Sequence, residues 1–236
     1  MQHYQSISQE SAQQVLPFPI GKAVCVGRNY ADHIAELNNT TPTEPLLFIK
    51  PSTAIVPIEA EIAIPKHSVC HNELEIALLV KEPITQAANW SDEKIQNSLW
   101  GVGLALDLTL RATQSELKEQ GYPWERAKAF DNSCPVSSFV AMKQVVDLQR
   151  LEFTLSVNDT VRQAGKSKMM LHNCVSLIKE ISQVFTLLPG DLVLTGTPKG
   201  VGPLTTGDKL ALTLNNADAT GSAMNSPLIT VSTTVV

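Results

Sequence analysis

The sequence predicts an α+β fold in which a mixed, curled β-sheet is flanked by a few helices. Strand-like runs outnumber helical ones, and the two kinds do not alternate regularly as they do in a doubly wound sheet. Hydrophobic residues make up 43% of the chain and charged residues 17%, which is enough for a sizeable core. With 236 residues, we expect an N-terminal leader at 1–20 packed on the surface of one large domain at 21–236.

In the first part of the chain, short apolar runs rich in β-forming residues indicate strands separated by polar turns. The expected strands are 22–26, 45–49, 58–65, 73–80 and 99–110. A short helix is expected within 31–37, and two more at 91–98 and 112–121. Ser91 is placed to cap the second helix, although Lys94 breaks the ideal capping box, and Gly121 is placed to end the third.

The later part of the chain contains three further strand-like runs and one amphipathic helix. Residues 151–159 predict a strand that runs into an Asn-Asp turn, and 191–198 and 208–214 predict strands that each follow a Gly-Asp pair. The helix is expected within 169–185, where apolar residues recur with the helical period at Leu177, Ile178, Ile181 and Val184.

Charge and composition exclude several classes of partner. Lys plus Arg is 18 and Asp plus Glu is 23, so the net charge is -5, and no basic stripe predicts nucleic-acid binding. No apolar run approaches the roughly 20 residues needed to cross a bilayer. The polar N-terminus does not have the pattern of a secretory signal. The 4 cysteines are far apart, so we expect reduced, packed thiols in a cytoplasmic protein rather than a zinc site.

Three carboxylates stand in unusually apolar surroundings. On a strand, Glu73 and Glu75 point the same way, roughly 7 Å apart, where they repel each other unless a positive charge offsets them. Asp107 is the one charged residue of the apolar run 104–110. Three carboxylates without cysteine or paired histidine favour Mg²⁺ or Mn²⁺ over zinc. The alternatives are two solvated glutamates at a strand end and an aspartate that caps a backbone N–H.

Two further candidates could act beside such a metal. His33 and Glu36 are one helical turn apart, so the carboxylate could orient the imidazole as a water-activating base. Lys128 lies among small and aromatic residues and could hold a carboxylate or stabilise an oxyanion. The simpler interpretations are a surface His-Glu pair on a short helix and a solvated loop lysine.

A glycine-rich stretch at 196–202 does not predict nucleotide binding, because it lacks both the P-loop pattern and the strand–GxGxxG–helix context. Its N–H groups and the Thr197 hydroxyl could instead bind a carboxylate.

Six stretches, in this order along the chain, resemble the fumarylacetoacetate hydrolase family, and in particular its short acylpyruvate hydrolase and oxaloacetate decarboxylase or tautomerase members. Each stretch is weak alone, whereas all six together are highly specific. They are VGRNYADH (26–33), LFIKPST (47–53), HNELEIAL (71–78), ALDLTLRATQ (105–114), GYPWERAKAFDNSCPVS (121–137) and LPGDLVLTGTPKGVGP (188–203).

The resemblance implies a mixed β-sheet roll of the family's C-terminal domain type, as a homodimeric catalytic domain over 21–236. It implies that Glu73, Glu75 and Asp107 hold Mg²⁺ or Mn²⁺. It implies that His33 and Glu36 activate water on a segment that closes over substrate, and that Lys128 lies beside the reacting oxygen. Substrate contacts are implied, directly or nearby, for Arg28, Lys50, Arg111, Gln114 and Thr197.

Two parts of the chain do not follow the family pattern. Relatives often carry Asp at the position of Ala112, which puts a supporting contact in doubt. The segment 215–236, uncharged except for Asp218, could not be placed on the pattern.

The function implied by the resemblance is metal-dependent hydrolysis of the C–C bond of acylpyruvates, such as fumarylpyruvate or acetylpyruvate, to pyruvate and a carboxylic acid, as in aromatic catabolism. The small 2-oxo acid substrate could instead be oxaloacetate, undergoing decarboxylation or tautomerisation. A 2-hydroxyhepta-2,4-diene-1,7-dioate isomerase with the same site is another alternative. A non-catalytic, metal-stabilised scaffold is the remaining interpretation.

Overall fold

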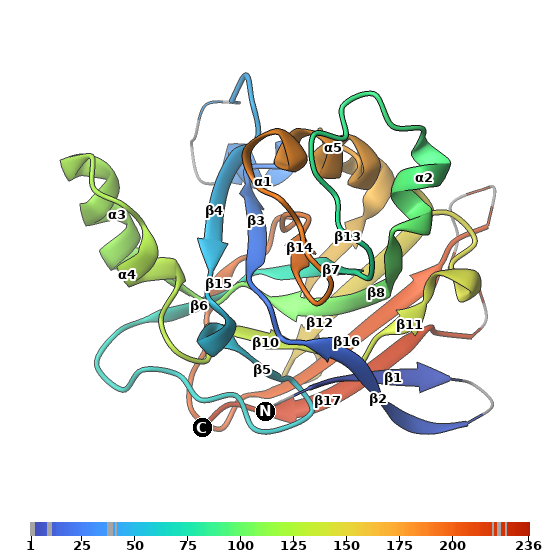
Figure 1. The fold of residues 1–236 in the computed structure, drawn as a ribbon. Coiled ribbons are helices and arrows are strands. Elements are labelled where there is room, and N and C mark those ends of the chain that lie inside the picture. The colour runs from blue at the N-terminus through green and yellow to red at the C-terminus, as the bar shows by residue number, and fades with distance from the viewer. Residues whose placement is uncertain are drawn as a thin grey trace.

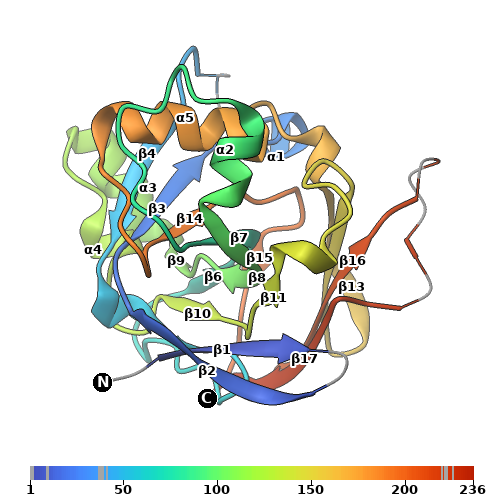
Figure 2. The same ribbon diagram turned by 45° about the vertical axis from the view of Figure 1, so that its right-hand side comes forward.

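The computed structural model describes residues 3–8, 11–36, 40, 42–218, 220, 223–224 and 226–236. It confirms the expected α+β class: curled β-sheets form the body of the molecule and the helices lie around them (Figures 1 and 2). Within these ranges, no helix is long and apolar enough to cross a membrane.

The largest sheet has eight strands and is mixed. Its order is β4-β3-β14-β7-β8-β10-β5, with β11 beside β8. β14 runs parallel to β3 and β10 runs parallel to β5, whereas the other neighbours are antiparallel. The strands are β3 (Ala23–Gly27), β4 (Leu46–Lys50), β5 (Ile55–Pro57), β7 (Leu74–Val80), β8 (Leu99–Leu106), β10 (Cys134–Val136), β11 (Val140–Ala141) and β14 (Leu192–Leu194). Every residue of β7 is buried, as its continuous apolar run predicts for a strand covered on both faces.

A second, antiparallel sheet has the order β13-β12-β16-β17. Its strands are β12 (Leu151–Val157), β13 (Thr160–Lys166), β16 (Lys209–Asn216) and β17 (Ile229–Thr234). The turn between β12 and β13 has positive φ at both Asn158 and Asp159, which is the geometry of a tight hairpin. β17 lies in the C-terminal segment that could not be placed from the sequence.

A third sheet of three short strands joins the largest one end to end. It contains β15 (Gly202–Pro203), β6 (Cys70–Asn72) and β9 (Thr109–Leu110). Glu73 alone separates β6 from β7, and Asp107 with Leu108 separates β8 from β9. The two crossings, meaning the points where the chain passes from one sheet to the other at Glu73 and at Asp107, lie side by side. The Asp107 N–H donates to the Glu73 carbonyl there at 2.8 Å.

The helices lie at the periphery, and two of the expected start and stop signals are present. They are α1 (Ala31–Glu36), α2 (Asp92–Asn97), α3 (Arg111–Gln120), α4 (Glu125–Lys128) and α5 (Cys174–Val184). The Ser91 side chain caps α2, and α3 ends at Gly121 with φ 70°. α5 starts later than the apolar pattern began, because the Asn173 side chain caps it by accepting from the Ser176 N–H. The four cysteines are buried and unpaired.

Three segments differ from the expected elements. The strand expected at 58–65 is wrong: its first residues form a turn, and only Ile62 makes an isolated bridge, to Val235. The strand expected over 99–110 is split at Asp107 into β8 and β9. The segment 1–20, expected to be a leader, contains an antiparallel hairpin of β1 (His3–Ser8) and β2 (Ser11–Pro19), for which its polar sequence gave no indication.

Candidate metal centre and pocket

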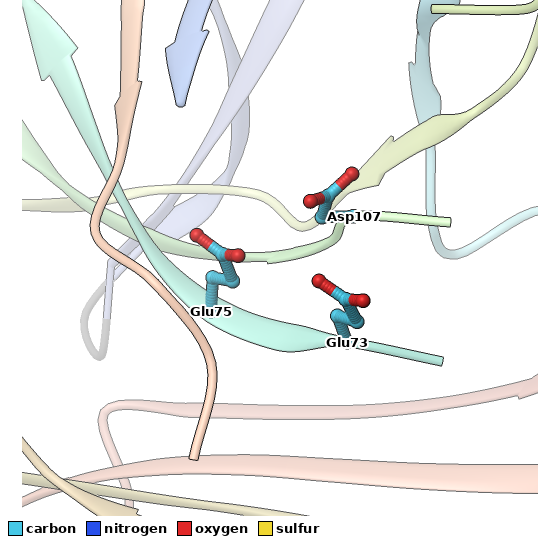
Figure 3. Close-up of side chains that lie close together, drawn as sticks. All are labelled: Glu73, Glu75 and Asp107. Atoms are coloured by element: carbon cyan, nitrogen blue, oxygen red, sulfur yellow. The ribbon is translucent and has the colours of Figure 1, made fainter. Parts of the chain in front are cut away.

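The three carboxylates singled out in the sequence converge. Glu73 and Glu75 project from the start of β7, and Asp107 faces them from the end of β8 (Figure 3). One carboxylate oxygen of each lies within 4.8 Å of one from each of the others. The three residues are 5%, 1% and 1% exposed, so the interpretation as solvated strand-end glutamates is wrong. The scaffold interpretation would have been favoured by Glu73 and Asp107 pointing apart, which they do not.

Two of the three carboxylates are paired with buried cations. Lys128 Nζ lies 2.9 Å from Glu73 Oε2 and 2.5 Å from Asp107 Oδ2. Lys50 Nζ lies 2.9 Å from Asp107 Oδ1, and the Arg111 guanidinium pairs with Glu73. Burial raises the pKa of Glu73, but Lys128 and then Arg111 hold it well below its usual range. Burial lowers the pKa of Lys128, but Asp107 and then Glu73 raise it above its usual value.

Glu75 has no such partner among the described residues. Its carboxylate accepts a hydrogen bond from the Gly196 N–H at 2.6 Å. Burial, and then the charges of Asp107 and Glu73, raise the pKa of Glu75 well above its ordinary value. Asp107 Oδ1, although close to Lys50, accepts no hydrogen bond from the described part of the chain. A hard divalent cation would let Glu75 ionise and would use this oxygen, so the residues present fit such an ion.

The His33–Glu36 pair on α1 is more ordered than a surface pair. His33 is 5% exposed, and its Nδ1 lies 3.2 Å from Glu36 Oε2. The other oxygen of Glu36 accepts a hydrogen bond from the Gly200 N–H at 2.9 Å. Because Nδ1 is engaged, the ring leaves Nε2 available to a ligand. Lys128, likewise, is buried in α4 rather than solvated in a loop.

The predicted residues meet around one pocket of about 400 Å³, part of it open to solvent. Lys50 does not line the pocket, because it is fully buried behind Asp107 and donates to the carbonyls of Leu108 and Ser133. Asp107 and Glu36 do not line it either. Those residues include His33, Glu73, Glu75, Lys128, Arg28, Arg111, Gln114 and Thr197.

The glycine-rich stretch binds carboxylates, but they are the protein's own. Gly196 donates to Glu75 and Gly200 donates to Glu36. This loop therefore fixes one member of the carboxylate trio (Glu73, Glu75 and Asp107) and one member of the His33–Glu36 pair. Gly196 has φ 93°, and a Cβ there would lie 2.7 Å from the Asn29 Cβ. The stretch therefore requires glycine for its backbone path.

Sequence reasoning missed Gln163, which organises the back of the site. It is 1% exposed on β13, and its Oε1 accepts from the Leu74 N–H and from Asn72 Nδ2, both at 2.8 Å. Its Nε2 donates to Thr197 Oγ1 at 2.8 Å, and that hydroxyl in turn donates to the Leu74 carbonyl. Nothing in the polar hairpin sequence around Gln163 indicates burial.

Lys118 and Trp124 also line the pocket and were not anticipated. The sequence did carry a signal for Lys118. It lies seven residues after Arg111 and four after Gln114, which places all three on the same face of α3. Ala112, where relatives often carry Asp, is exposed.

Comparisons with known proteins show which family the sequence and fold resemble. The family described as fumarylacetoacetate (FAA) hydrolase C-terminal matches residues 22–232. Oxaloacetate tautomerase YcgM of Escherichia coli (strain K12) is 46% identical over 208 residues, which cover 87% of this chain and 94% of that protein. The crystal structure of a protein from Yersinia pestis CO92 assigned to the fumarylacetoacetate hydrolase family has a TM-score of 0.88 and 42% identity, covering 99% of this chain and 100% of that one.

A further solved structure holds a metal and a ligand. It is the fumarylpyruvate hydrolase from Pseudomonas aeruginosa in complex with Mn²⁺ and pyruvate, with a TM-score of 0.83 and 30% identity, covering 99% of this chain and 96% of that one. Because the family matches most of the length of this chain, and because these relatives are similar to it, the chain belongs to the fumarylacetoacetate hydrolase family.

Proposed function

We propose that this chain is a Mg²⁺- or Mn²⁺-dependent oxaloacetate tautomerase, which interconverts the keto and enol forms of its substrate. The observation that carries the proposal is the meeting of the carboxylate trio, Lys128 and the oriented His33 at one pocket. The 46% identity to an oxaloacetate tautomerase, against 30% to a fumarylpyruvate hydrolase, favours tautomerisation over the acylpyruvate hydrolysis first expected.

Glu73, Glu75 and Asp107 would hold the metal ion. When bound, it would supply Lewis-acid stabilisation of negative charge on the oxygens of a 2-oxo acid.

Each remaining step falls to a side chain of the pocket. His33 Nε2 takes a proton from C3 of the keto form and returns it to the oxygen on C2, while Glu36 holds the ring in place. Lys128 stabilises charge on the substrate oxygens. Arg111 donates to the Gln114 side-chain oxygen at 2.7 Å, which turns the Gln114 amide N–H groups towards a substrate carboxylate.

The test follows the loss of the enol absorbance of oxaloacetate with Mg²⁺ or Mn²⁺ present. His33→Gln should lower kcat by roughly 10²-fold or more, and Glu36→Gln should lower it less because the imidazole itself remains. His67→Gln is the matched control, because His67 is exposed and does not line the pocket. Full activity of a metal-stripped sample, or of His33→Gln, would refute the proposal.

Acylpyruvate hydrolysis is the second candidate, favoured by the His33–Glu36 geometry, which suits removal of a proton from water. Fumarylpyruvate, acetylpyruvate and oxaloacetate should be compared at equal enzyme concentration. The readouts are pyruvate release, carbon dioxide release and enol decay. Faster pyruvate release from an acylpyruvate than enol decay of oxaloacetate would reverse the assignment, and faster carbon dioxide release would make the chain a decarboxylase.

We also propose that the protein is a homodimer, as the family resemblance implies. Size-exclusion chromatography with light scattering should give twice the 25.6 kDa of one chain. The mass of one chain would contradict this.

A further inference from the structure

One side of the pocket is formed by three polar residues on a single face of α3. Arg111, Gln114 and Lys118 follow one another at helical spacing, and all three line the pocket. Arg111 is nearest to the trio, because it pairs with Glu73. Side chains four apart on a helix have Cβ atoms about 5–6 Å apart. Gln114 and Lys118 are therefore neighbours on the pocket side of α3.

Lys118 differs from Lys128 and Arg111, which also line the pocket, because no carboxylate pairs with it among the described residues. Lys128 and Arg111 each pair with a carboxylate of the trio, as does Lys50 behind it. The Lys118 ammonium forms no ion pair or hydrogen bond with any residue that the structure describes, although the side chain is only partly exposed. A half-buried ammonium without a counter-charge is costly unless a ligand supplies that charge.

The Lys118 side chain is nevertheless held in place. Its ammonium lies over the Trp124 ring, 4.9 Å from the centroid, and Trp124 in turn packs against Phe48 with centroids 6.1 Å apart. Both aromatic residues line the same pocket. Burial, and then the charges of Arg28 and Arg111, lower the pKa of Lys118 to about 8.

We propose that Lys118 binds the carboxylate at the far end of the substrate, so that the pocket prefers 2-oxo dicarboxylates to 2-oxo acids with a neutral end. The inference rests on the proposed function, because it takes the 2-oxo acid end of the substrate to lie over the trio. It adds a specificity determinant that is separate from the residues that move the proton.

The binding test uses malate and lactate, which share a 2-hydroxy acid end and differ in the far carboxylate. Each is titrated calorimetrically into the protein with Mg²⁺ present. Lys118→Met should weaken malate binding about tenfold or more, as expected for a lost charged hydrogen bond, and should change lactate binding less than about twofold. Lys118→Arg should keep most of the preference for malate.

A kinetic arm uses oxaloacetate and its C4 methyl ester, which lacks the far charge. Lys118→Met should raise KM for oxaloacetate by about the same factor, with kcat and the KM for the ester nearly unchanged. Lys94→Met is the matched control, because Lys94 also lies over an aromatic ring, Trp90, but outside the pocket. It should change none of these values, and Lys118→Gln replaces Lys118→Met if the latter does not fold.

The outcomes separate this inference from the proposed function. Equal losses for malate and lactate, or no loss for malate, would overturn the role of Lys118. A wild-type protein that does not tautomerise oxaloacetate, but whose malate affinity still depends on Lys118, would overturn the proposed function and support the inference.

Discussion

Replacing Glu75 by Gln tests the electrostatic account of the trio. The substitution removes one charge but keeps the size of the side chain and an oxygen that can accept from Gly196. Glu75 is the member of the trio whose charge is opposed by burial and by both neighbours. We therefore expect Glu75→Gln to stabilise the metal-free protein and to abolish its stabilisation by metal.

The magnitude follows from the spacing of the carboxylates. Two like charges within 4.8 Å of each other repel by about 3.5 kcal/mol or more at an effective dielectric constant of about 20. Lys128 and Lys50 offset part of this repulsion, and proton uptake by the folded protein relieves more. A net gain of about 1–2 kcal/mol remains. For a chain of this size, that corresponds to a rise in Tm of about 2–8 °C.

The pH dependence has a definite sign. The pKa of Glu75 in the folded protein lies above its ordinary value of 4.5. The folded state therefore holds more protons than the unfolded state from about pH 4.5 up to the raised pKa, and stability falls as pH rises through that window. The advantage of Glu75→Gln should be absent below pH 4.5 and should grow as the pH is raised towards neutral.

The assay is thermal unfolding at pH 7 in EDTA and then with Mg²⁺ or Mn²⁺. Wild type should gain about 2.7 kcal/mol at a metal concentration one hundred times Kd, and Glu75→Gln should gain almost nothing. Glu82→Gln is the matched control, because Glu82 is exposed just beyond the far end of β7. The reasoning is refuted if Glu75→Gln is less stable than wild type in EDTA, or if metal stabilises both equally.

Three further predictions concern the surroundings of the trio. Gly196→Ala should lower the free energy of unfolding by about 2 kcal/mol or more, because the new Cβ would lie 2.7 Å from the Asn29 Cβ and the backbone φ is 93°. Urea unfolding measures this loss, and an unchanged unfolding midpoint would contradict it. Thr197→Val should cost about 1–3 kcal/mol in the same assay, because the Leu74 carbonyl loses its 2.8 Å donor, while Thr205→Val at the surface should cost little. The kcat/KM for oxaloacetate should fall above about pH 8 as Lys118 loses its proton, and Lys118→Arg should remove that fall. A pH profile of kcat/KM that is the same in wild type and Lys118→Arg would argue against a charged Lys118 in binding.

The sequence was most informative where a polar residue interrupts an apolar run. Glu73 and Asp107 were recognisable because ionised carboxylates are rare in such runs unless they are paired or bind a metal. The convergence of both with Glu75 required only that a strand alternates its faces and that two strands lie side by side, and β7 and β8 do.

Other features depended on contacts that local sequence does not encode. The alternation at 58–65 resembled a strand, but the backbone N–H groups of these residues donate to scattered partners. Ile58 donates to the Val136 carbonyl, whereas Ile62 and Ile64 donate to carbonyls near the C-terminus, so no strand forms. Gln163 is buried because β13 passes behind Thr197, a contact between residues 34 positions apart. The engagement of Lys50 with Asp107 likewise depends on tertiary packing, since Lys50 lies on β4 and Asp107 follows β8.

The crossing of two chain segments from one sheet to another has a consequence for how such a site can diversify. Glu73 and Asp107 stand at these crossings, so the floor of the site, formed by Glu73 and the adjacent Asp107, is part of the backbone route that joins the sheets. The rim, meaning the lining residues His33 on α1 and Arg111, Gln114 and Lys118 on α3, comes from helices that lie outside the sheets (Figure 1). Substitutions in the rim can therefore alter which acid is accepted while the floor stays intact, as expected of a family that includes both an oxaloacetate tautomerase and a fumarylpyruvate hydrolase.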